Sequence, residues 1–220
     1  MTRVTAFVFM QGMITALKPT RRGRVRVYLD GQPGLDLAKE LARELELGRP
    51  LGAQQVAELV ARDRRESAYR RAVRLVARRP RTEQELRRQF ERSGLSELEQ
   101  EAVMDSLRQA KLVSDADFAA AWLENRMAFR PRGAWALRAE LRARGVPAEV
   151  IEIALTGFDE DQAALQGARH GLRKYQHLSP ELFRQRLSAY LLRRGFQHPT
   201  IDPLVERLAV EREVERKDLT

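Results

Sequence analysis

The stretch of this sequence whose residue types could do chemistry is RDRRESAYRRAVRLVARRPR, residues 62–81, which carries nine arginines against Asp63 and Glu66. Guanidinium groups hydrogen-bond phosphates and carboxylates in a planar fork, so this stretch could bind a polyanion or an acidic protein surface. The whole chain has 40 basic and 31 acidic residues, a net charge of +9 and a pI near 10.5. This balance favours a polyanionic or acidic partner.

A helix over residues 66–78 would bury Tyr69, Ala72, Val73 and Val76 and turn arginines outward. The arginines on that outward side are Arg70, Arg71, Arg74 and Arg78. So many like charges repel one another unless a partner compensates them, which favours a binding surface over a merely solvated helix.

Further arginines recur at the borders of the predicted units and at helix ends. They complete the candidate partner-binding set: Arg79, Arg81, Arg130, Arg132, Arg142, Arg144, Arg193 and Arg194. A cation at a helix C-terminus also stabilises the helix dipole, by about 0.3–1 kcal/mol. For the last four of these arginines, a binding role and this simple stabilisation stay equally open.

No pattern in the sequence predicts catalysis. His170, His177 and His198 lack the spacing of metal ligands, no serine lies in a nucleophile elbow, and the carboxylates alternate with arginines at helical spacing. The absence of cysteine excludes disulfides, thiolate metal sites and a cysteine nucleophile, and it fits a reducing compartment such as the cytoplasm. We therefore expect a protein that is not an enzyme, with no catalytic residues, cofactor or metal.

The N-terminal run VTAFVFM is too short to span a membrane and lacks a cleavage pattern after it. We expect residues 1–12 to be a disordered leader, with translation starting at Met1, Met10 or Met13. No membrane contact is predicted.

Residues 13–61 are predicted to form a β-hairpin followed by a helical segment. Val25, Val27 and Leu29 alternate with polar residues at strand period, and Pro19, Thr20 and Gly23 predict the turn before them. After this hairpin, leucines recur every four residues from Leu37 to Leu45. This spacing predicts a helix with Asp36 as its N-cap and Gly48 and Pro50 at its end.

An internal repeat dominates the rest of the chain. Three segments align without a gap: ELRRQFERSGL from Glu85, ALRAELRARGV from Ala136 and RLSAYLLRRGF from Arg186. The glycines Gly94, Gly145 and Gly195 predict a helix that ends in a left-handed cap, followed by an apolar residue that folds back and by a second helix. Ser114, three residues before Asp117, predicts an N-terminal cap better than a metal pair of Asp115 and Asp117.

One further helix is predicted before each of these pairs, over residues 66–78, 115–129 and 159–175. The sequence therefore predicts a mainly α fold of three tandem three-helix units, with about nine helices, after the N-terminal hairpin and helix. The expected boundaries are 62–113, 114–158 and 159–215, with a tail at 216–220. Pro199 and Pro203 fall where the last helix should begin.

Four runs of residues together resemble the RecX regulatory proteins of bacteria. They are ITALKPTRRGRVRVYLDG, VARRPRTEQELRRQFERSGL, KLVSDADFAAAWLENR and RPRGAWALRAELRARGV. The resemblance is strongest over residues 14–156. At the family's most recognisable run this chain has Asp115, Phe118, Trp122 and Arg126, and Arg79, Pro80 and Arg81 occupy the border before the repeat. The one-turn spacing of Phe118 and Trp122 predicts core packing.

The resemblance implies a helical protein that binds the RecA recombinase and the RecA–DNA filament and restrains filament growth, ATP hydrolysis and strand exchange. It places the chain in DNA repair, recombination and the SOS response. We expect a monomer whose stacked units are long enough to bridge neighbouring RecA protomers. An alternative is a DNA-binding protein that contacts single- or double-stranded DNA directly through helix-turn-helix-like units.

Overall fold

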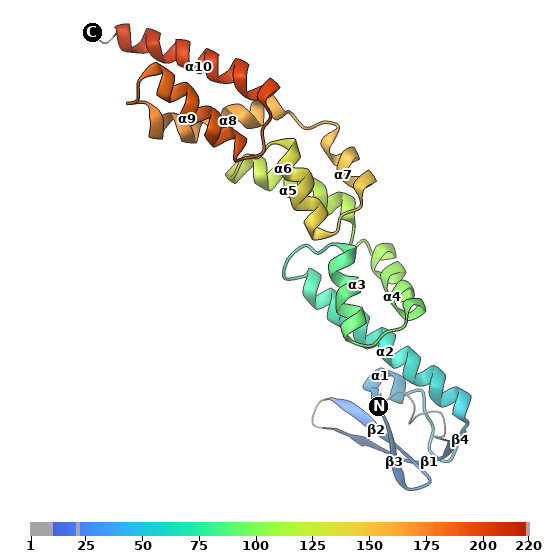
Figure 1. Cartoon of the computed structure of the whole chain (residues 1–220). Helices are drawn as coiled ribbons and strands as arrows, with labels where there is room; N and C mark the ends of the chain where they lie inside the picture. The colour runs from blue at the N-terminus through green and yellow to red at the C-terminus, as the bar shows by residue number, and fades with distance from the viewer. Residues whose placement is uncertain (1–10, 21–22, 219–220) are drawn as a thin grey trace. The chain divides into compact units, whose positions relative to one another are not determined.

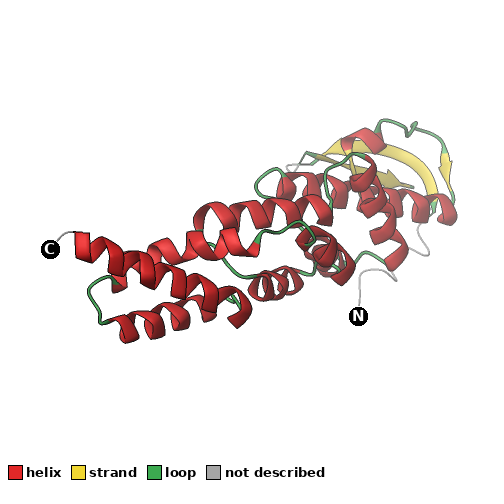
Figure 2. Cartoon of the chain, turned by 90° about the horizontal axis from the view of Figure 1, so that it is seen from above, coloured by secondary structure: helices red, strands yellow, loops and turns green. Residues whose placement is uncertain are grey.

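The computed structural model describes residues 11–20 and 23–218. The predicted leader therefore falls almost entirely outside the described residues, although Gly12 already belongs to the first strand. The described chain is mainly helical and begins with an antiparallel sheet, which confirms the predicted fold class (Figures 1 and 2). It divides into two compact parts, an N-terminal part of residues 1–79 and 86–112 and a C-terminal part of residues 80–85 and 113–220. None of the described helices is both long and apolar enough to cross a membrane.

The predicted hairpin is present as strands β1 (Gly12–Pro19) and β2 (Arg24–Leu29), which pair in antiparallel register. Two further strands, β3 (Gln32–Ala38) and β4 (Pro50–Leu51), extend it to a four-stranded sheet of order β3-β2-β1-β4. The sheet buries its alternating apolar side chains against the helix that follows.

The prediction of a helix with Asp36 as its N-cap is wrong, because residues 32–38 form strand β3. Asp30 and Gly31 make the tight two-residue turn between β2 and β3, with φ of 48° and 77°. Leu35 and Leu37 are buried at strand period, whereas Asp36 points outward and binds the Arg26 guanidinium of β2 at 2.8 Å. Only the four-residue helix α1 (Lys39–Ala42) remains of the prediction.

Helix α2 (Ala53–Val76) is longer than the helix predicted over residues 66–78. Its start packs on the sheet through Val56 and through Asp63, which is only 8% exposed. The Asp63 carboxylate accepts hydrogen bonds from the Arg24 guanidinium at 2.5 Å and from the Ala38 backbone N–H at 2.7 Å. On the predicted buried stripe, Ala72 is fully buried, and the three larger side chains are half-buried.

The remaining helices follow the repeat. They are α3 (Glu83–Arg92), α4 (Glu97–Gln109), α5 (Asp115–Phe129), α6 (Ala134–Arg144), α7 (Ala148–Leu155), α8 (Glu160–Tyr175), α9 (Pro180–Leu192) and α10 (His198–Asp218). The helices predicted over 115–129 and 159–175 are confirmed as α5 and α8. Helix α10 accommodates Pro199 in its first turn and Pro203 inside it, and it continues to Asp218, within the residues predicted as a tail.

The three repeat glycines adopt the predicted left-handed conformation, with φ of 74° at Gly94, 85° at Gly145 and 84° at Gly195. In each case the glycine N–H donates at 2.9 Å to the carbonyl three residues earlier. The next N–H donates to the carbonyl five residues earlier, at 3.3, 3.1 and 3.3 Å respectively. These paired bonds form a Schellman cap, so the same turn ends α3, α6 and α9.

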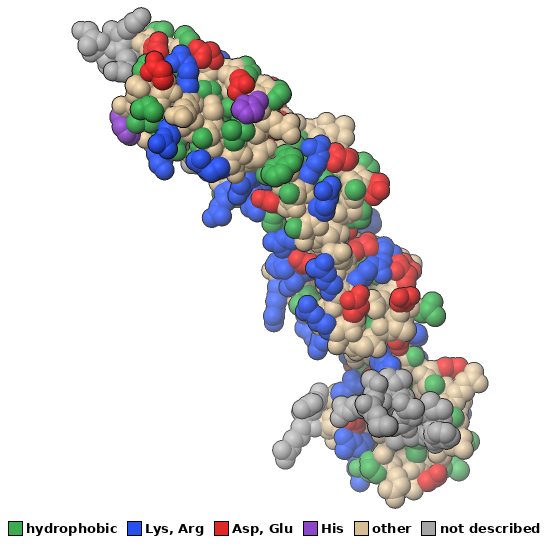
Figure 3. Space-filling model, viewed as in Figure 1, with side chains coloured by type: hydrophobic (Ala, Val, Ile, Leu, Met, Phe, Trp, Pro, Cys, Tyr) green, Lys and Arg blue, Asp and Glu red, His purple; other side chains and the backbone are tan. Residues whose placement is uncertain are grey.

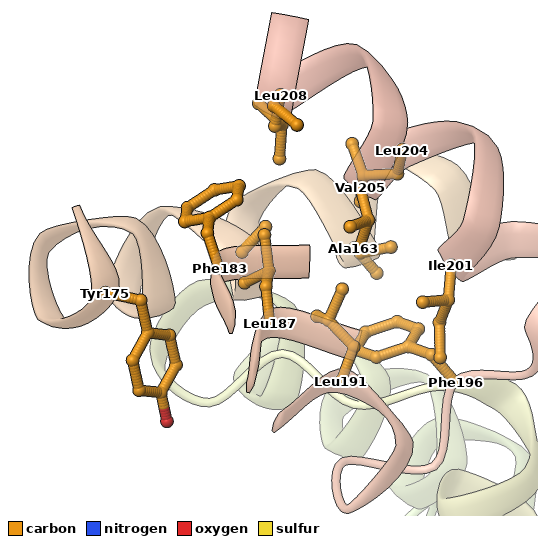
Figure 4. Packing of buried hydrophobic residues seen from close by; sticks show 13 residues of the cluster. Ala163, Tyr175, Phe183, Leu187, Leu191, Phe196, Ile201, Leu204, Val205 and Leu208 are labelled. Atoms are coloured by element: carbon orange, nitrogen blue, oxygen red, sulfur yellow. The ribbon is translucent and has the colours of Figure 1, made fainter. Parts of the chain in front are cut away.

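The last three helices enclose the largest apolar cluster of the C-terminal part (Figure 4). Phe183, Leu187 and Leu191 of α9 are fully buried and point toward α10 and α8. Phe196, directly after the Gly195 cap, packs beside Leu191. The apolar residue that follows the glycine therefore folds back on the last turn of the helix, as predicted.

Candidate functional site

The arginines of α2 differ in their surroundings. Arg71 and Arg74 are exposed and line one hollow of about 290 Å³, together with Arg64, Ser67 and Ser93. The Arg71 guanidinium donates to the Ser93 hydroxyl at 3.2 Å. No carboxylate among the described residues forms an ion pair with Arg64, Arg71 or Arg74. The Asp63 carboxylate also lines the hollow, but it is bound by the Arg24 guanidinium and the Ala38 N–H. Three guanidinium groups and two hydroxyls thus face the same space.

Arg70 is the exception in the predicted set. Its guanidinium binds the Glu66 carboxylate at 2.8 Å and the Glu40 carboxylate at 3.0 Å, and these hydrogen bonds raise the pKa of Arg70. Two carboxylates therefore already balance its charge. Arg64 was not among the predicted binding residues. It also lines the hollow, because it lies seven residues before Arg71 and therefore on the same face of α2.

Arg78 and Arg79 are exposed just after α2 ends, whereas Arg81 is mostly covered. Arg81 lies in the C-terminal part, where it binds Glu85 at 3.4 Å, and Glu85 also binds Arg144 at 3.2 Å. The Thr82 hydroxyl donates to the Arg144 carbonyl oxygen at 2.8 Å. Arg81 and Arg144 therefore help to pack residues 80–85 against the end of α6.

The predicted Ser114 cap is confirmed at the start of α5, and Asp115 contacts the start of α3. The Ser114 hydroxyl accepts from the Asp117 N–H at 3.1 Å, and the Asp115 carboxylate accepts from the Glu83 N–H at 2.9 Å. Both residues thus satisfy helix N-termini. The described residues include no group of three His, Asp or Glu side chains suited to a metal ion.

Phe118 is buried, and its ring stacks on that of Trp122 with 5.8 Å between centroids, which confirms its predicted core role. Trp122 is only half-buried. The guanidinium carbons of Arg126 and Arg144 lie 4.3 and 4.8 Å from its ring centroid, and its Nε1 donates to Glu140 at 2.8 Å. The Trp122 ring therefore packs at the edge of the apolar cluster that contains Phe118, and Arg126, Arg144 and Glu140 contact it from the polar side.

The other arginines of the candidate set surround the start and end of α6 and the end of α9. Arg130, Arg142 and Arg193 are exposed. Arg132 lies 3.7 Å from Glu140, and Arg194 donates to the Pro131 carbonyl oxygen at 3.2 Å while covering the Tyr190 ring. Figure 3 shows basic side chains interspersed with carboxylates over the helices, as these ion pairs require.

Models of two RecX domains match the chain. The model described as RecX, first three-helix domain, matches residues 68–107, and that of the second three-helix domain matches residues 114–155. The regulatory protein RecX of Mycobacterium leprae is 39% identical over 160 residues, which cover 70% of this chain and 93% of the relative. That of Geobacillus thermodenitrificans is 28% identical over 201 residues, which cover 86% of this chain and 75% of the relative.

Two solved structures show the same fold. A crystal structure of a regulatory protein RecX has a TM-score of 0.67 at 24% identity and covers 88% of this chain and 98% of its own. The crystal structure of RecX from Lactobacillus salivarius has a TM-score of 0.61 at 19% identity and covers 67% of this chain and 98% of its own. With the identity and coverage of the Mycobacterium relative, the chain belongs to the RecX family of regulatory proteins.

Proposed function

We propose that this chain is a non-enzymatic regulator of RecA that binds RecA and its nucleoprotein filament and restrains filament growth, ATP hydrolysis and strand exchange. Membership of the RecX family supports regulation, and the basic helical surface supports a polyanionic or acidic target. The observation that carries the proposal is the hollow lined by Arg64, Arg71 and Arg74, because its cations have no ion-pair partner within the described chain.

The hollow fits an oxyanion. The guanidinium groups of Arg64, Arg71 and Arg74 and the Ser67 hydroxyl are donors that suit a carboxylate or a phosphate, whereas the Ser93 hydroxyl already donates to the Gln89 carbonyl oxygen at 3.0 Å. Arg78 adds charge at the end of the same helix, whereas Arg70 adds little because Glu40 and Glu66 already bind it. Helix α2, with 24 residues, spans about 36 Å, which is long enough for its arginines to contact a partner at more than one point.

Charge reversal of Arg71 and Arg74 together tests this proposal. We expect the variant to need about tenfold more protein to inhibit the DNA-dependent ATPase of RecA, because removing exposed cations slows charge-steered association. A matched variant reverses Arg43 and Arg65, which are also exposed but lie outside the hollow and produce the same change in net charge. Undiminished inhibition by the folded Arg71 and Arg74 variant would contradict a role of the hollow in binding RecA. So would an equal loss of inhibition in the control variant.

Direct DNA binding remains the second candidate, because the same donors suit the phosphates of DNA. A salt titration on DNA without RecA separates the two functions. Tight binding whose log K falls with a slope near 0.9 per phosphate contact would favour direct DNA binding. Binding that appears only with RecA filaments would favour the RecA regulator.

A further inference from the structure

The C-terminal part contains a hollow whose lining differs from that of the arginine hollow on α2. It has a volume of about 560 Å³ and lies between α5, the end of α7 and the start of α8. Most of its lining is apolar and includes Ala120, Leu123, Met127, Ala154 and Phe158. We name this hollow the α5 groove. The proposed function does not use it.

The apolar walls of the α5 groove are held in place by the core. Leu123, Ala154 and Phe158 pack on the apolar cluster that contains Phe118, and Met127 packs on the cluster of the last three helices. All four of these lining side chains are nevertheless only half-buried. The groove is therefore a fixed apolar surface that the described chain leaves partly open.

The third three-helix unit shows what covers the corresponding face. In the alignment of the repeats, Leu155 at the end of α7 corresponds to Val205 of α10. Helix α10 continues beyond this point and packs on α8, with Ala209 only 1% exposed. Its Arg212 guanidinium donates at 3.0 Å to the carbonyl oxygen of Gln176, the residue after α8. A helix of the same chain thus covers this face of α8.

The second unit has no such continuation among the described residues. Helix α7 ends at Leu155, and the chain turns at Gly157 into α8, whose N-cap Asp159 lines the groove. Helix α5 packs on α7 as α8 packs on α10, but no helix extends from α7 along α5. A short helix placed in the α5 groove would complete the arrangement that α10 makes in the third unit.

The charges at the α5 groove have the opposite sign to those of the arginine hollow. Glu124 and Asp159 line the groove, and none of the described residues that line it is basic. The Asp159 carboxylate accepts from the Gln162 N–H at 2.9 Å, and neither carboxylate forms an ion pair within the described chain. The groove is therefore an acidic apolar surface on a chain with a net charge of +9. It would repel the phosphates of a nucleic acid.

We propose that the α5 groove binds a short amphipathic helix of a second protein, with apolar side chains seated on Leu123, Met127 and Phe158 and with lysine or arginine beside Glu124 and Asp159. Helices that bind in grooves insert apolar residues spaced three or four positions apart. Basic residues next to these anchors are complementary to the two carboxylates, which steers the encounter and fixes the orientation of the helix.

This inference goes beyond the proposed function, because it assigns a partner other than RecA to a different surface. The test uses the full chain and the fluorescein-labelled peptide KLAKLAKKLAKLAK, a basic sequence whose leucines recur at helical spacing. The matched acidic peptide, ELAELAEELAELAE, keeps the leucines and reverses the charge. By fluorescence anisotropy, we expect the basic peptide to bind at least about tenfold more tightly than the acidic one, because carboxylates border the groove.

Two substitutions test the apolar and the charged side of the groove. Ala120→Trp fills the groove from an exposed position of α5, so the circular dichroism spectrum should not change. We expect about tenfold weaker binding of the basic peptide, because the indole occupies the space of an apolar anchor. Ala139→Trp, at an exposed position of α6 outside the groove, is the matched control and should bind normally.

The second substitution, Glu124→Lys, should weaken binding of the basic peptide about threefold, because exposed ion pairs contribute little each. Its matched control is Glu149→Lys, which makes the same charge change at an exposed position of α7 outside the groove. Equal losses in the two variants would contradict the assigned orientation of the basic residues.

No binding of the basic peptide by the wild-type protein, or unchanged affinity in Ala120→Trp, would overturn the proposal. So would a wild-type protein that sediments as a dimer and becomes monomeric with Ala120→Trp, because a second copy of this chain would then occupy the groove. Ala120→Trp should retain inhibition of the RecA ATPase, and its loss in the folded variant would overturn the assignment to a partner other than RecA. Absence of RecA inhibition in the wild-type protein would refute only the proposed function.

Discussion

Replacing Gly195 by alanine should test the contact between the second and third three-helix units. Gly195 has a φ of 84°, and its added Cβ would lie 2.3 Å from the Ala136 Cβ and 2.8 Å from the Ala136 backbone nitrogen. Real Cβ atoms do not approach so closely, so the backbone of α6 or of the α9–α10 turn must shift. A flexible side chain could move away, but the first turn of a helix cannot do so without losing its packing.

The expected loss has two contributions. An alanine held in the left-handed backbone conformation costs about 1–2 kcal/mol, and overpacking against a fixed neighbour typically costs about 1–3 kcal/mol. Gly195→Ala should therefore lower the free energy of unfolding by about 2–5 kcal/mol. The matched control is Gly94→Ala, because Gly94 has a similar φ of 74° but open space around the added Cβ. It should lose only the first contribution, about 1–2 kcal/mol.

Urea unfolding followed by far-ultraviolet circular dichroism measures both variants. We expect a larger loss of unfolding free energy for Gly195→Ala than for Gly94→Ala. Equal losses in the two variants would show that Gly195 is needed for its backbone conformation alone, and the close packing of the α9–α10 turn on α6 would then be refuted.

Three further substitutions test individual contacts. Asp63→Ala removes the acceptor shared by Arg24 and the Ala38 N–H, and we expect a loss of about 2–3 kcal/mol in urea unfolding, reduced because Arg24 is about one-third exposed; an unchanged midpoint would contradict a structural role. Ser114→Ala removes the N-cap of α5 and should cost about 1 kcal/mol, whereas Ser188→Ala, in the middle of α9, is the control. The third concerns Glu101, whose pKa is lowered from 4.5 to about 2 by hydrogen bonds from Arg87 and Arg108. Because this folded-state pKa lies below the unfolded one, the carboxylate stabilises the fold above about pH 4.5, and that contribution is lost as the pH falls toward 2. The stability difference between wild type and Glu101→Gln should shrink over this range, and a difference independent of pH would refute the ion pairs.

Local signals in the sequence predicted much of the helical repeat. The left-handed caps at Gly94, Gly145 and Gly195 and the cap at Ser114 depend on residues within one or two turns, so their spacing is sufficient. The strand β3 was missed because Leu35 and Leu37 fit strand period while Leu37, Leu41 and Leu45 also fit helical period. Pairing of residues 32–38 with β2, including the pair of Arg26 and Asp36, decides in favour of the strand.

The surroundings of the candidate site depend on contacts between distant residues. Arg70 looks equivalent to Arg71 and Arg74 in the sequence, yet Glu40, thirty residues earlier, pairs with it. Helical periodicity predicts the face of a side chain, but only the tertiary structure shows whether its charge already has a partner.

Regulation of RecA by this chain is tested most directly by comparing its binding to RecA filaments on DNA with its binding to the same DNA alone, across a salt titration. We expect salt-sensitive binding that is much tighter to the filament and that inhibits its ATPase activity. Equal affinity for DNA with and without RecA, with no effect on ATP hydrolysis, would contradict it.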